Sequence, residues 1–189
     1  MERVPHYFWA VRIPDTIKQT IHDELTRIKP IFPFKRWVDL QDYHITLAFL
    51  GAVTAQQLPT IIQAMGDAVS KQQAFRMEIE GLNVFGSQKS PRIFWASVNE
   101  VKPLFQLQAI VHNTCLAAGF SLETRPYHPH ITLARKWGGS EEFKIDDLVA
   151  HNPFGEQALS FQVSEIVLYK SNIENTPKYE SIAAFSLVD

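Results

Sequence analysis

The sequence predicts two β-sheets, each with helices on its outer face, and a cleft between them. Two observations support this prediction. The chain repeats itself: a shift of 86 positions aligns Phe8-Trp9-Ala10 with Phe94-Trp95-Ala96, and His44 to Ala48 with His130 to Ala134, without a gap. Strand patterns also alternate with helix patterns across mostly short connections, which is typical of packed layers of sheet and helix. We therefore expect one domain built from two units, about 1–86 and 87–172.

Each unit begins with a strand and a helix. Residues 7–13 and 92–98 are rich in residues that favour strands. Behind Pro14 and Asp15, the residues Ile17, Ile21, Leu25 and Ile28 recur at helical spacing. Pro103 opens the matching helix, whose apolar positions are Leu104, Leu107, Val111 and Cys115, and Gly119 ends it. The two helices occupy equivalent places in the repeat.

The later part of each unit adds strands around one further helix. Strands are expected at 44–48 and 130–134. The run from Thr54 to Gln57 is a capping box that opens an apolar helical stripe, with a weaker second copy between Lys144 and His151. Alternation then predicts strands near 75–79 and 161–169. A final strand, 178–188, repeats the beginning of the unit, and we expect it to close the first lobe.

Composition limits the class of protein. The 189 residues carry a net charge of -2, which disfavours binding of long nucleic acids by bulk charge and predicts that any nucleic-acid contact is local. The lone Cys115 excludes a disulfide framework and fits a reducing compartment. No apolar run approaches the roughly 18 residues of a membrane span, and the first residues do not resemble an export signal. We expect a monomer in the cytoplasm that does not contact membranes.

The repeated His-x-Thr is the main candidate for chemistry. Strict alternation along a strand puts His44, Thr46 and Ala48 on one face, and Ile45, Leu47 and Phe49 on the face toward the helices. The second copy offers the same trio at His130, Thr132 and Ala134. If an approximate two-fold axis relates the two lobes, both trios face one cleft.

Two imidazoles beside two hydroxyls suit acid–base chemistry on a phosphate ester. Neutral imidazole accepts a proton and imidazolium donates one, and histidine provides both forms near neutrality. A threonine hydroxyl donates to a phosphate oxygen whose charge must be held. The scheme requires no metal or other cofactor. The run His128-Pro129-His130 invites a zinc interpretation, but the sequence shows no cluster of three or four ligands around it.

Other residues were weighed as substrate contacts. Arg135 stands where the first copy has Phe49, and arginine suits phosphate binding. Strict alternation puts Arg135 on the face opposite His130, so only a bulge or a strand end would bring it into the cleft; otherwise it is a surface arginine. Basic residues at 35–36, 89–92 and 125 are expected in loops, where they would rim the cleft. Four aromatic residues are candidates for stacking on a base or for the core: Trp37, Phe85, Trp95 and Tyr127.

These residues resemble those of the two-histidine phosphoesterase superfamily, and specifically the LigT-like RNA 2′,3′-cyclic phosphodiesterases. The resemblance covers nearly the whole chain and includes the blocks Tyr7 to Ala10, Arg36 to Val38, His44 to Gly51, Pro129 to Arg135 and Ile166 to Tyr169. It implies a bilobal α+β fold in which two antiparallel sheets face a central cleft. It also implies metal-independent hydrolysis of a 2′,3′-cyclic phosphate to a 2′-phosphate, with RNA ends or cyclic nucleotides as partners.

By the family's pattern, His44 is the proton donor, His130 is the proton acceptor, and Thr46 and Thr132 bind the phosphate. The family was also described through 2′-5′ RNA ligation, the reverse reaction. Two alternatives remain open from the residues. One is an esterase for a small cyclic phosphate or a 2′-5′ oligoadenylate, which the basic loops mildly disfavour. The other is a non-catalytic module that binds RNA ends, which has no need of two proton-transfer groups.

Overall fold

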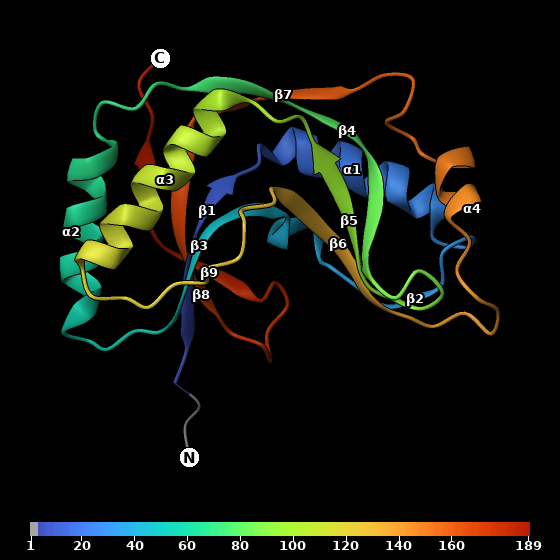
Figure 1. Cartoon of the computed structure of the whole chain (residues 1–189), viewed down its shortest axis with the longest axis horizontal. Helices are drawn as coiled ribbons and strands as arrows, with labels where there is room; N and C mark the ends of the chain where they lie inside the picture. Colours follow the sequence, from blue (N-terminus) through green and yellow to red (C-terminus); the bar gives the residue numbers. More distant parts are fainter. Residues whose placement is uncertain (1–3) are drawn as a thin grey trace.

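The computed structural model describes residues 4–189, which form nine strands, four α-helices and one short 3-10 helix (Figure 1). The α+β class is confirmed. The strands are β1 (His6–Arg12), β2 (Phe34–Trp37), β3 (His44–Ala52), β4 (Phe75–Gly86), β5 (Pro91–Val98), β6 (His130–Trp137), β7 (Leu159–Val163), β8 (Glu165–Ser171) and β9 (Tyr179–Ser186). The helices are α1 (Asp15–Ile28), η1 (Leu40–Asp42), α2 (Gln57–Val69), α3 (Lys102–Ala117) and α4 (Ile145–Ala150).

The strands form one antiparallel sheet in the order β7-β4-β5-β6-β3-β1-β8-β9, with β2 added beside β6. The sheet is weakest in the middle, where β3 and β6 share a single residue pair, Ile45 with Ile131. We call the strands β3, β1, β8 and β9 the first lobe, and the strands β2, β6, β5, β4 and β7 the second lobe. The two predicted sheets are therefore halves of one sheet, joined by one pairing between the two His-x-Thr strands.

The lobes do not coincide with the two sequence units. Strand β4 belongs to the first unit but pairs with β5 in the second lobe. Strand β8 belongs to the second unit but pairs with β1 in the first lobe, and the final strand β9 pairs with β8 at the edge. Each lobe is thus built from strands of both units.

The helices of one sequence unit also pack against elements of the other unit. Helix α3 of the second unit packs against α2 and β3, and α2 also contacts β9. Figure 1 shows α1 and α4 toward the other end of the molecule, where Phe32, just after α1, contacts Phe94 of β5. No helix within residues 4–189 has the length and hydropathy needed to cross a membrane.

Local sequence signals explain where the helices begin and end. The capping box before α2 is formed, because the Thr54 N–H donates to the Gln57 side chain and the Gln57 N–H donates to the Thr54 hydroxyl. Gly119 ends α3 with a φ of 87°, which disfavours a residue that has a side chain. Helix α4 packs weakly against the core. It buries Leu148, whereas its apolar residue Val149 is 76% exposed.

Candidate active site

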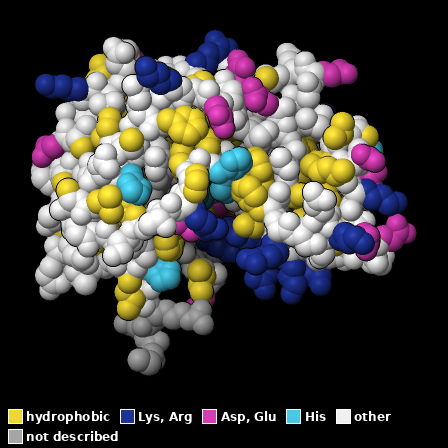
Figure 2. All heavy atoms as spheres, in the orientation of Figure 1, with side chains coloured by type: hydrophobic (Ala, Val, Ile, Leu, Met, Phe, Trp, Pro, Cys, Tyr) yellow, Lys and Arg dark blue, Asp and Glu magenta, His cyan; other side chains and the backbone are white. Residues whose placement is uncertain are grey.

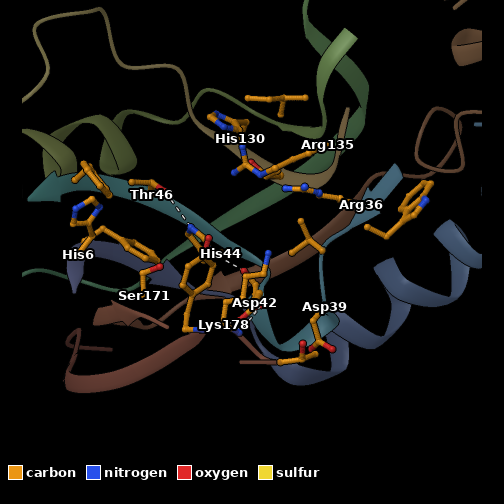
Figure 3. A pocket seen from close by; sticks show the side chains of 18 residues that line it. His6, Arg36, Asp39, Asp42, His44, Thr46, His130, Arg135, Ser171 and Lys178 are labelled. Atoms are coloured by element: carbon orange, nitrogen blue, oxygen red, sulfur yellow. Dashed lines mark hydrogen bonds between the residues drawn. The ribbon is translucent and has the colours of Figure 1, made fainter. Parts of the chain in front are cut away.

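Strands β3 and β6 bring the two His-x-Thr pairs to one cavity. His44, Thr46, His130, Thr132 and Arg135 all line a cavity of about 370 Å³ between the lobes (Figure 3). The structure therefore brings the two candidate histidines, the two candidate threonines and Arg135 to one cavity. The two pairs lie on neighbouring strands of the sheet, which run antiparallel to each other.

A β-bulge interrupts each of these strands directly after the threonine. Along β1 the pairing advances by one residue, from Trp9 to Ala10, while along β3 it advances by two, from Ala48 to Thr46. The extra residue of β3 is Leu47. In β6 the extra residue is Leu133, because Phe94 of β5 pairs with Ala134 and the next residue, Trp95, pairs with Thr132. A one-residue shift moves every later side chain to the opposite face.

The bulges correct the expected faces. Ala48 and Ala134, expected in the cleft beside the threonines, lie in the core with exposed fractions of 6% and 0%. Phe49, expected to face the helices, lines the cavity instead and is 52% exposed. Arg135, the residue equivalent to Phe49, reaches the cavity in the same way. Strict alternation was wrong beyond the threonines because it allowed for no extra residue.

The first strands of the two units also differ in register by one residue. Ala10 pairs with Thr46, whereas Trp95 pairs with Thr132, although the repeat aligns Trp9 with Trp95. As a result Trp9 is fully buried in the main core. Trp95 instead packs beside the second histidine of the site. The repeated Phe-Trp-Ala is therefore a sequence repeat whose two tryptophans point in different directions.

Both histidines are oriented by a backbone carbonyl two residues earlier in the chain. Nδ1 of His44 lies 2.7 Å from the Asp42 carbonyl oxygen, and Nδ1 of His130 lies 2.8 Å from that of His128. A carbonyl oxygen only accepts, so Nδ1 carries the proton in each ring. Nε2 is thus the ring nitrogen that is available to accept a proton. In His44, Nε2 lies 3.1 Å from the Thr46 hydroxyl.

Aromatic rings surround the two histidines. The His44 ring centroid lies 4.8 Å from that of Phe8, 5.2 Å from Tyr179 and 6.0 Å from Tyr169. The His130 ring packs against Phe85 at 5.1 Å and against Trp95 at 5.7 Å. These rings remove water from the imidazoles and hold them in place.

The surroundings lower the pKa of both histidines. Burial lowers the pKa of His44 from 6.5 to about 4, and the charges of His130, Lys18 and Arg135 add to this effect. Burial also lowers the pKa of His130, with further contributions from the charges of His128 and Arg135. The nearby positive charges that add to the effect of burial favour a bound anion, because a phosphate would offset them and stabilise a protonated histidine.

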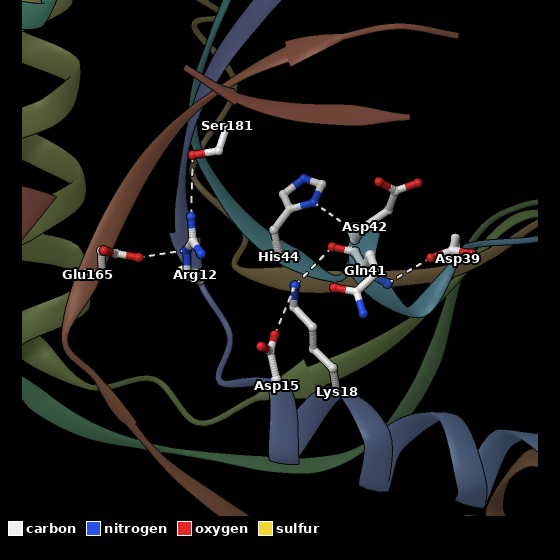
Figure 4. A network of polar contacts seen from close by, with 9 residues as sticks. All are labelled: Arg12, Asp15, Lys18, Asp39, Gln41, Asp42, His44, Glu165 and Ser181. Atoms are coloured by element: carbon white, nitrogen blue, oxygen red, sulfur yellow. Dashed lines mark hydrogen bonds and ion pairs between the residues drawn. The ribbon is translucent and has the colours of Figure 1, made fainter. Parts of the chain in front are cut away.

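A polar network supports His44 from below (Figure 4). The buried Lys18 donates from Nζ to the Gln41 carbonyl at 2.9 Å and steadies η1, the segment that ends at Asp42. The Asp42 carboxylate, itself only 4% exposed, accepts from the backbone N–H groups of Lys178 and Tyr179 at 2.9 to 3.1 Å. Asp42 thus connects the turn before His44 to the beginning of β9.

Several of these residues carried no recognisable sequence signal. Phe8 and Tyr169 belong to blocks that resemble the family, but nothing marked them as neighbours of His44. Asp42 and Tyr179 are 137 residues apart in the sequence and meet only in the fold. Arg36, grouped above with loop residues, lies on strand β2 and lines the cavity.

The remaining candidates lie around the site. Trp37 lines the same cavity. Phe85, Tyr127 and His128 line a second cavity of about 1060 Å³ that adjoins the first at Thr46 and His130. Trp95 is 4% exposed, so it supports His130 and does not present a face to a base. Among residues 4–189, no group of three or more His, Cys, Asp or Glu side chains is placed to hold a metal ion.

An antiparallel sheet whose halves each bring a His-x-Thr pair to one cavity is the architecture of a two-histidine phosphoesterase. Comparison with known proteins agrees. The family model described as LigT-like phosphoesterase matches residues 11–95 and 97–179. The chain belongs to this LigT-like phosphoesterase family, and the resemblance seen in the sequence is confirmed.

Relatives and solved structures support the same family. The chain is 43% identical over 183 residues to the RNA 2′,3′-cyclic phosphodiesterase of Geobacillus stearothermophilus, covering 97% of this chain and 57% of that protein. It is 37% identical to the enzyme of the same name from Bacillus subtilis, covering 97% of both. Escherichia coli LigT complexed with 3′-AMP superposes with a TM-score of 0.78 at 22% identity, covering 98% of this chain and 99% of LigT. At that identity, the superposition shows the fold alone.

Proposed function

We propose that the protein hydrolyses RNA 2′,3′-cyclic phosphate ends to 2′-phosphate ends, without a metal. The observation that carries the proposal is the placement of two histidines, each with Nδ1 held by a carbonyl and Nε2 as its proton-exchanging atom, around one cavity. The names of the relatives at 43% and 37% identity point to the same substrate.

The proposed reaction is an in-line displacement at phosphorus. His130 removes a proton from water, the water oxygen bonds to phosphorus, and the bond from phosphorus to the 3′ oxygen breaks. His44 gives a proton to the departing 3′ oxygen, so the products are a 2′-phosphate and a free 3′ hydroxyl. Attack and departure occur on opposite sides of phosphorus, which requires one histidine on each side.

Three other residues of the cavity, Thr46, Thr132 and Arg135, hold the reacting phosphate in this proposal. The hydroxyls of Thr46 and Thr132 donate to non-bridging oxygens, and the guanidinium of Arg135 offsets their charge. His44 must be protonated to act as the acid, and its low pKa leaves it neutral in the empty site. The negative charge of the bound cyclic phosphate raises that pKa and completes the acid.

The two lobes are not equivalent, and this sets the product. Arg135 of the second lobe stands where the repeat places Phe49 in the first lobe, and both line the cavity, so the two sides of the site differ in charge at this position. We expect the ribose to bind in one orientation and to yield the 2′-phosphate alone. Ligation of a 2′-phosphate end to a 5′ hydroxyl would use the same two proton transfers in reverse, with hydrolysis prevailing when ends are dilute.

The test is an assay of cyclic nucleotides and cyclic-ended oligonucleotides in EDTA, with chromatographic separation of the 2′- and 3′-phosphate products. We expect full activity in EDTA, and a loss of about 10² to 10⁴ fold in turnover for His44→Ala and for His130→Ala. His151→Ala is the control, because His151 is exposed and lines neither cavity.

Three results would contradict the proposal. They are restoration of EDTA-inhibited activity by added zinc or manganese, a dominant 3′-phosphate product, and wild-type turnover in either variant. Tight binding of cyclic ends without turnover would indicate the non-catalytic module instead. We also propose that the enzyme acts as a cytoplasmic monomer, which sedimentation and cell fractionation would test.

A further inference from the structure

Two arginines stand directly opposite each other at one end of the cavity. Strand β2 pairs with β6 in a register that sets Arg36 against Arg135, and both side chains line the cavity with the two histidines (Figure 3). Like charges opposite each other on neighbouring strands are destabilising. Within residues 4–189, neither guanidinium forms an ion pair or a hydrogen bond with another side chain. This arrangement is explained if the two cations share an anionic ligand.

The charge is concentrated locally. The whole chain has a net charge of -2, yet Figure 2 shows Lys and Arg side chains gathered along one edge of the central hollow. Arg36 is exposed at the mouth of the cavity, where it remains accessible to solvent and to a ligand. The planar guanidinium suits phosphate oxygens better than other side chains do.

The two arginines lie at different distances from the histidines. After burial, the charge of Arg135 is among the causes that lower the pKa of His44 and of His130, and Arg36 is not among them. Arg36 lies on β2, which pairs with β6 on the edge opposite β5, and Figure 3 shows its side chain farther from His130 than that of Arg135. Arg135 is therefore placed for the reacting phosphate, and Arg36 for an anionic group farther along the same ligand.

We propose that Arg36 binds a second phosphate, the one carried on O5′ of the terminal nucleotide. This inference rests on the proposed function. The ribose with the cyclic phosphate carries its next phosphate on O5′, one sugar away from the reacting phosphorus. A cavity of about 370 Å³ is of the size that holds one small ligand, so both phosphates of one nucleotide fit along it. The group on O5′ is either a terminal phosphate or the diester of an RNA chain.

The experiment compares three substrates: adenosine 2′,3′-cyclic phosphate, its 5′-phosphorylated form, and a dinucleotide that ends in a cyclic phosphate. We expect the protein to prefer the two substrates with a phosphate on O5′ by about 10 to 100 fold in kcat/KM, through KM. Arg36→Gln should remove this preference and leave kcat/KM for the first substrate within about threefold. The matched control is Lys35→Gln, the same charge change on the same strand, because Lys35 does not line the cavity and lies against Gly138.

The substrates that are affected by Arg36→Gln show whether the second phosphate is a terminal phosphate or part of an RNA chain. Loss of preference only for the 5′-phosphorylated nucleotide assigns the site to a terminal phosphate, and loss only for the dinucleotide assigns it to RNA. An equal loss on all three substrates would place Arg36 on the reacting phosphate and overturn the inference. A wild-type protein without any preference would overturn it as well.

A binding measurement separates this inference from the proposed function. Adenosine 2′,5′-bisphosphate and adenosine 2′-phosphate, measured by calorimetry, require no turnover. We expect the bisphosphate to bind about 10 to 100 fold more tightly, with the difference lost in Arg36→Gln. If no cyclic phosphate is hydrolysed but this difference is found, the proposed function fails and the second-phosphate site stands. If cyclic phosphates are hydrolysed but the two ligands bind with equal affinity, the proposed function stands and the second-phosphate site fails.

Discussion

At the scale of single residues, the two histidines share a hydrogen-bonding pattern and differ in their neighbours. Each donates from Nδ1 to a carbonyl two residues earlier, and the two carbonyls, of Asp42 and His128, are equivalent in the repeat. His44 packs among Phe8, Tyr169 and Tyr179, which come from three strands of the first lobe. The duplication therefore preserved the tautomer, and the fold made the two surroundings unequal.

The lowered histidine pKa values predict an acidic optimum for kcat/KM. This parameter reports the free enzyme, in which one histidine must be protonated and the other neutral. The singly protonated pair is most abundant between the two pKa values, and both are lowered from 6.5, that of His44 to about 4. We expect a bell-shaped profile with its maximum below pH 6.5, for a substrate whose diester stays ionised throughout. Initial rates at low substrate from pH 4 to 9 check it, and a maximum above pH 7 would contradict it.

At the scale of elements, two bulges decide what faces the cavity. Leu47 in β3 and Leu133 in β6 are extra residues that have no partner in the neighbouring strand. The side chains that follow therefore change face, and Phe49 and Arg135 point into the cavity. Alternation predicts strand faces well up to the threonines and fails after them. The reason is that a bulge depends on the register with a partner strand, and apolar residues such as leucine fit a regular strand and a bulge equally well.

The link between η1 and β9 gives a prediction about Asp42. Asp42→Ala leaves the part-buried N–H groups of Lys178 and Tyr179 without a protein acceptor, which should lower the free energy of unfolding by about 1 to 3 kcal/mol in total. It also loosens Tyr179 against His44, so kcat should fall. Asp42→Asn keeps one acceptor oxygen and should lose less on both counts.

Urea unfolding and steady-state kinetics of the two variants test this role. The control is Asp67→Ala, because Asp67 accepts a hydrogen bond from exposed Gln63 on α2, away from η1 and β9. If Asp42→Asn and Asp42→Ala lose the same free energy of unfolding and the same kcat, or if Asp42→Ala loses no stability, the carboxylate does not hold β9.

At the scale of the whole molecule, the two repeat units are interleaved. The exchange of β4 and β8 gives each lobe strands from both units, and α3 of the second unit packs on β3 of the first. The buried side chains of both lobes belong to one main cluster. We therefore propose that the chain is a single domain, in which neither unit completes a lobe without the other.

A single domain should unfold in one cooperative transition. Trp9 lies in the first lobe, whereas Trp37, Trp95 and Trp137 lie in the second. In the variant Trp9→Phe, fluorescence reports the second lobe alone, while far-UV circular dichroism reports both lobes. We expect the same urea midpoint from both signals. Midpoints that differ beyond error would show that the lobes unfold separately.

The repeat, the helices and the candidate residues of the site can all be recognised in the sequence alone. Helical spacing in Ile17 to Ile28, the capping box at Thr54 and the turn at Gly119 are local signals, because they depend on residues within a few positions of one another. The paired His-x-Thr identified His44, Thr46, His130 and Thr132, since two copies at equal spacing need no structure to be recognised.

Three features depend on the three-dimensional fold: which lobe each strand joins, which side chains turn into the cavity, and what surrounds each histidine. Strand exchange sets β4 beside β5 and β8 beside β1, and the pairing of β2 with β6 sets Arg36 opposite Arg135. Asp42 meets Tyr179 across 137 residues of chain. Such contacts depend on packing between segments far apart in the sequence, and a one-residue change of register reverses every face without altering the local pattern.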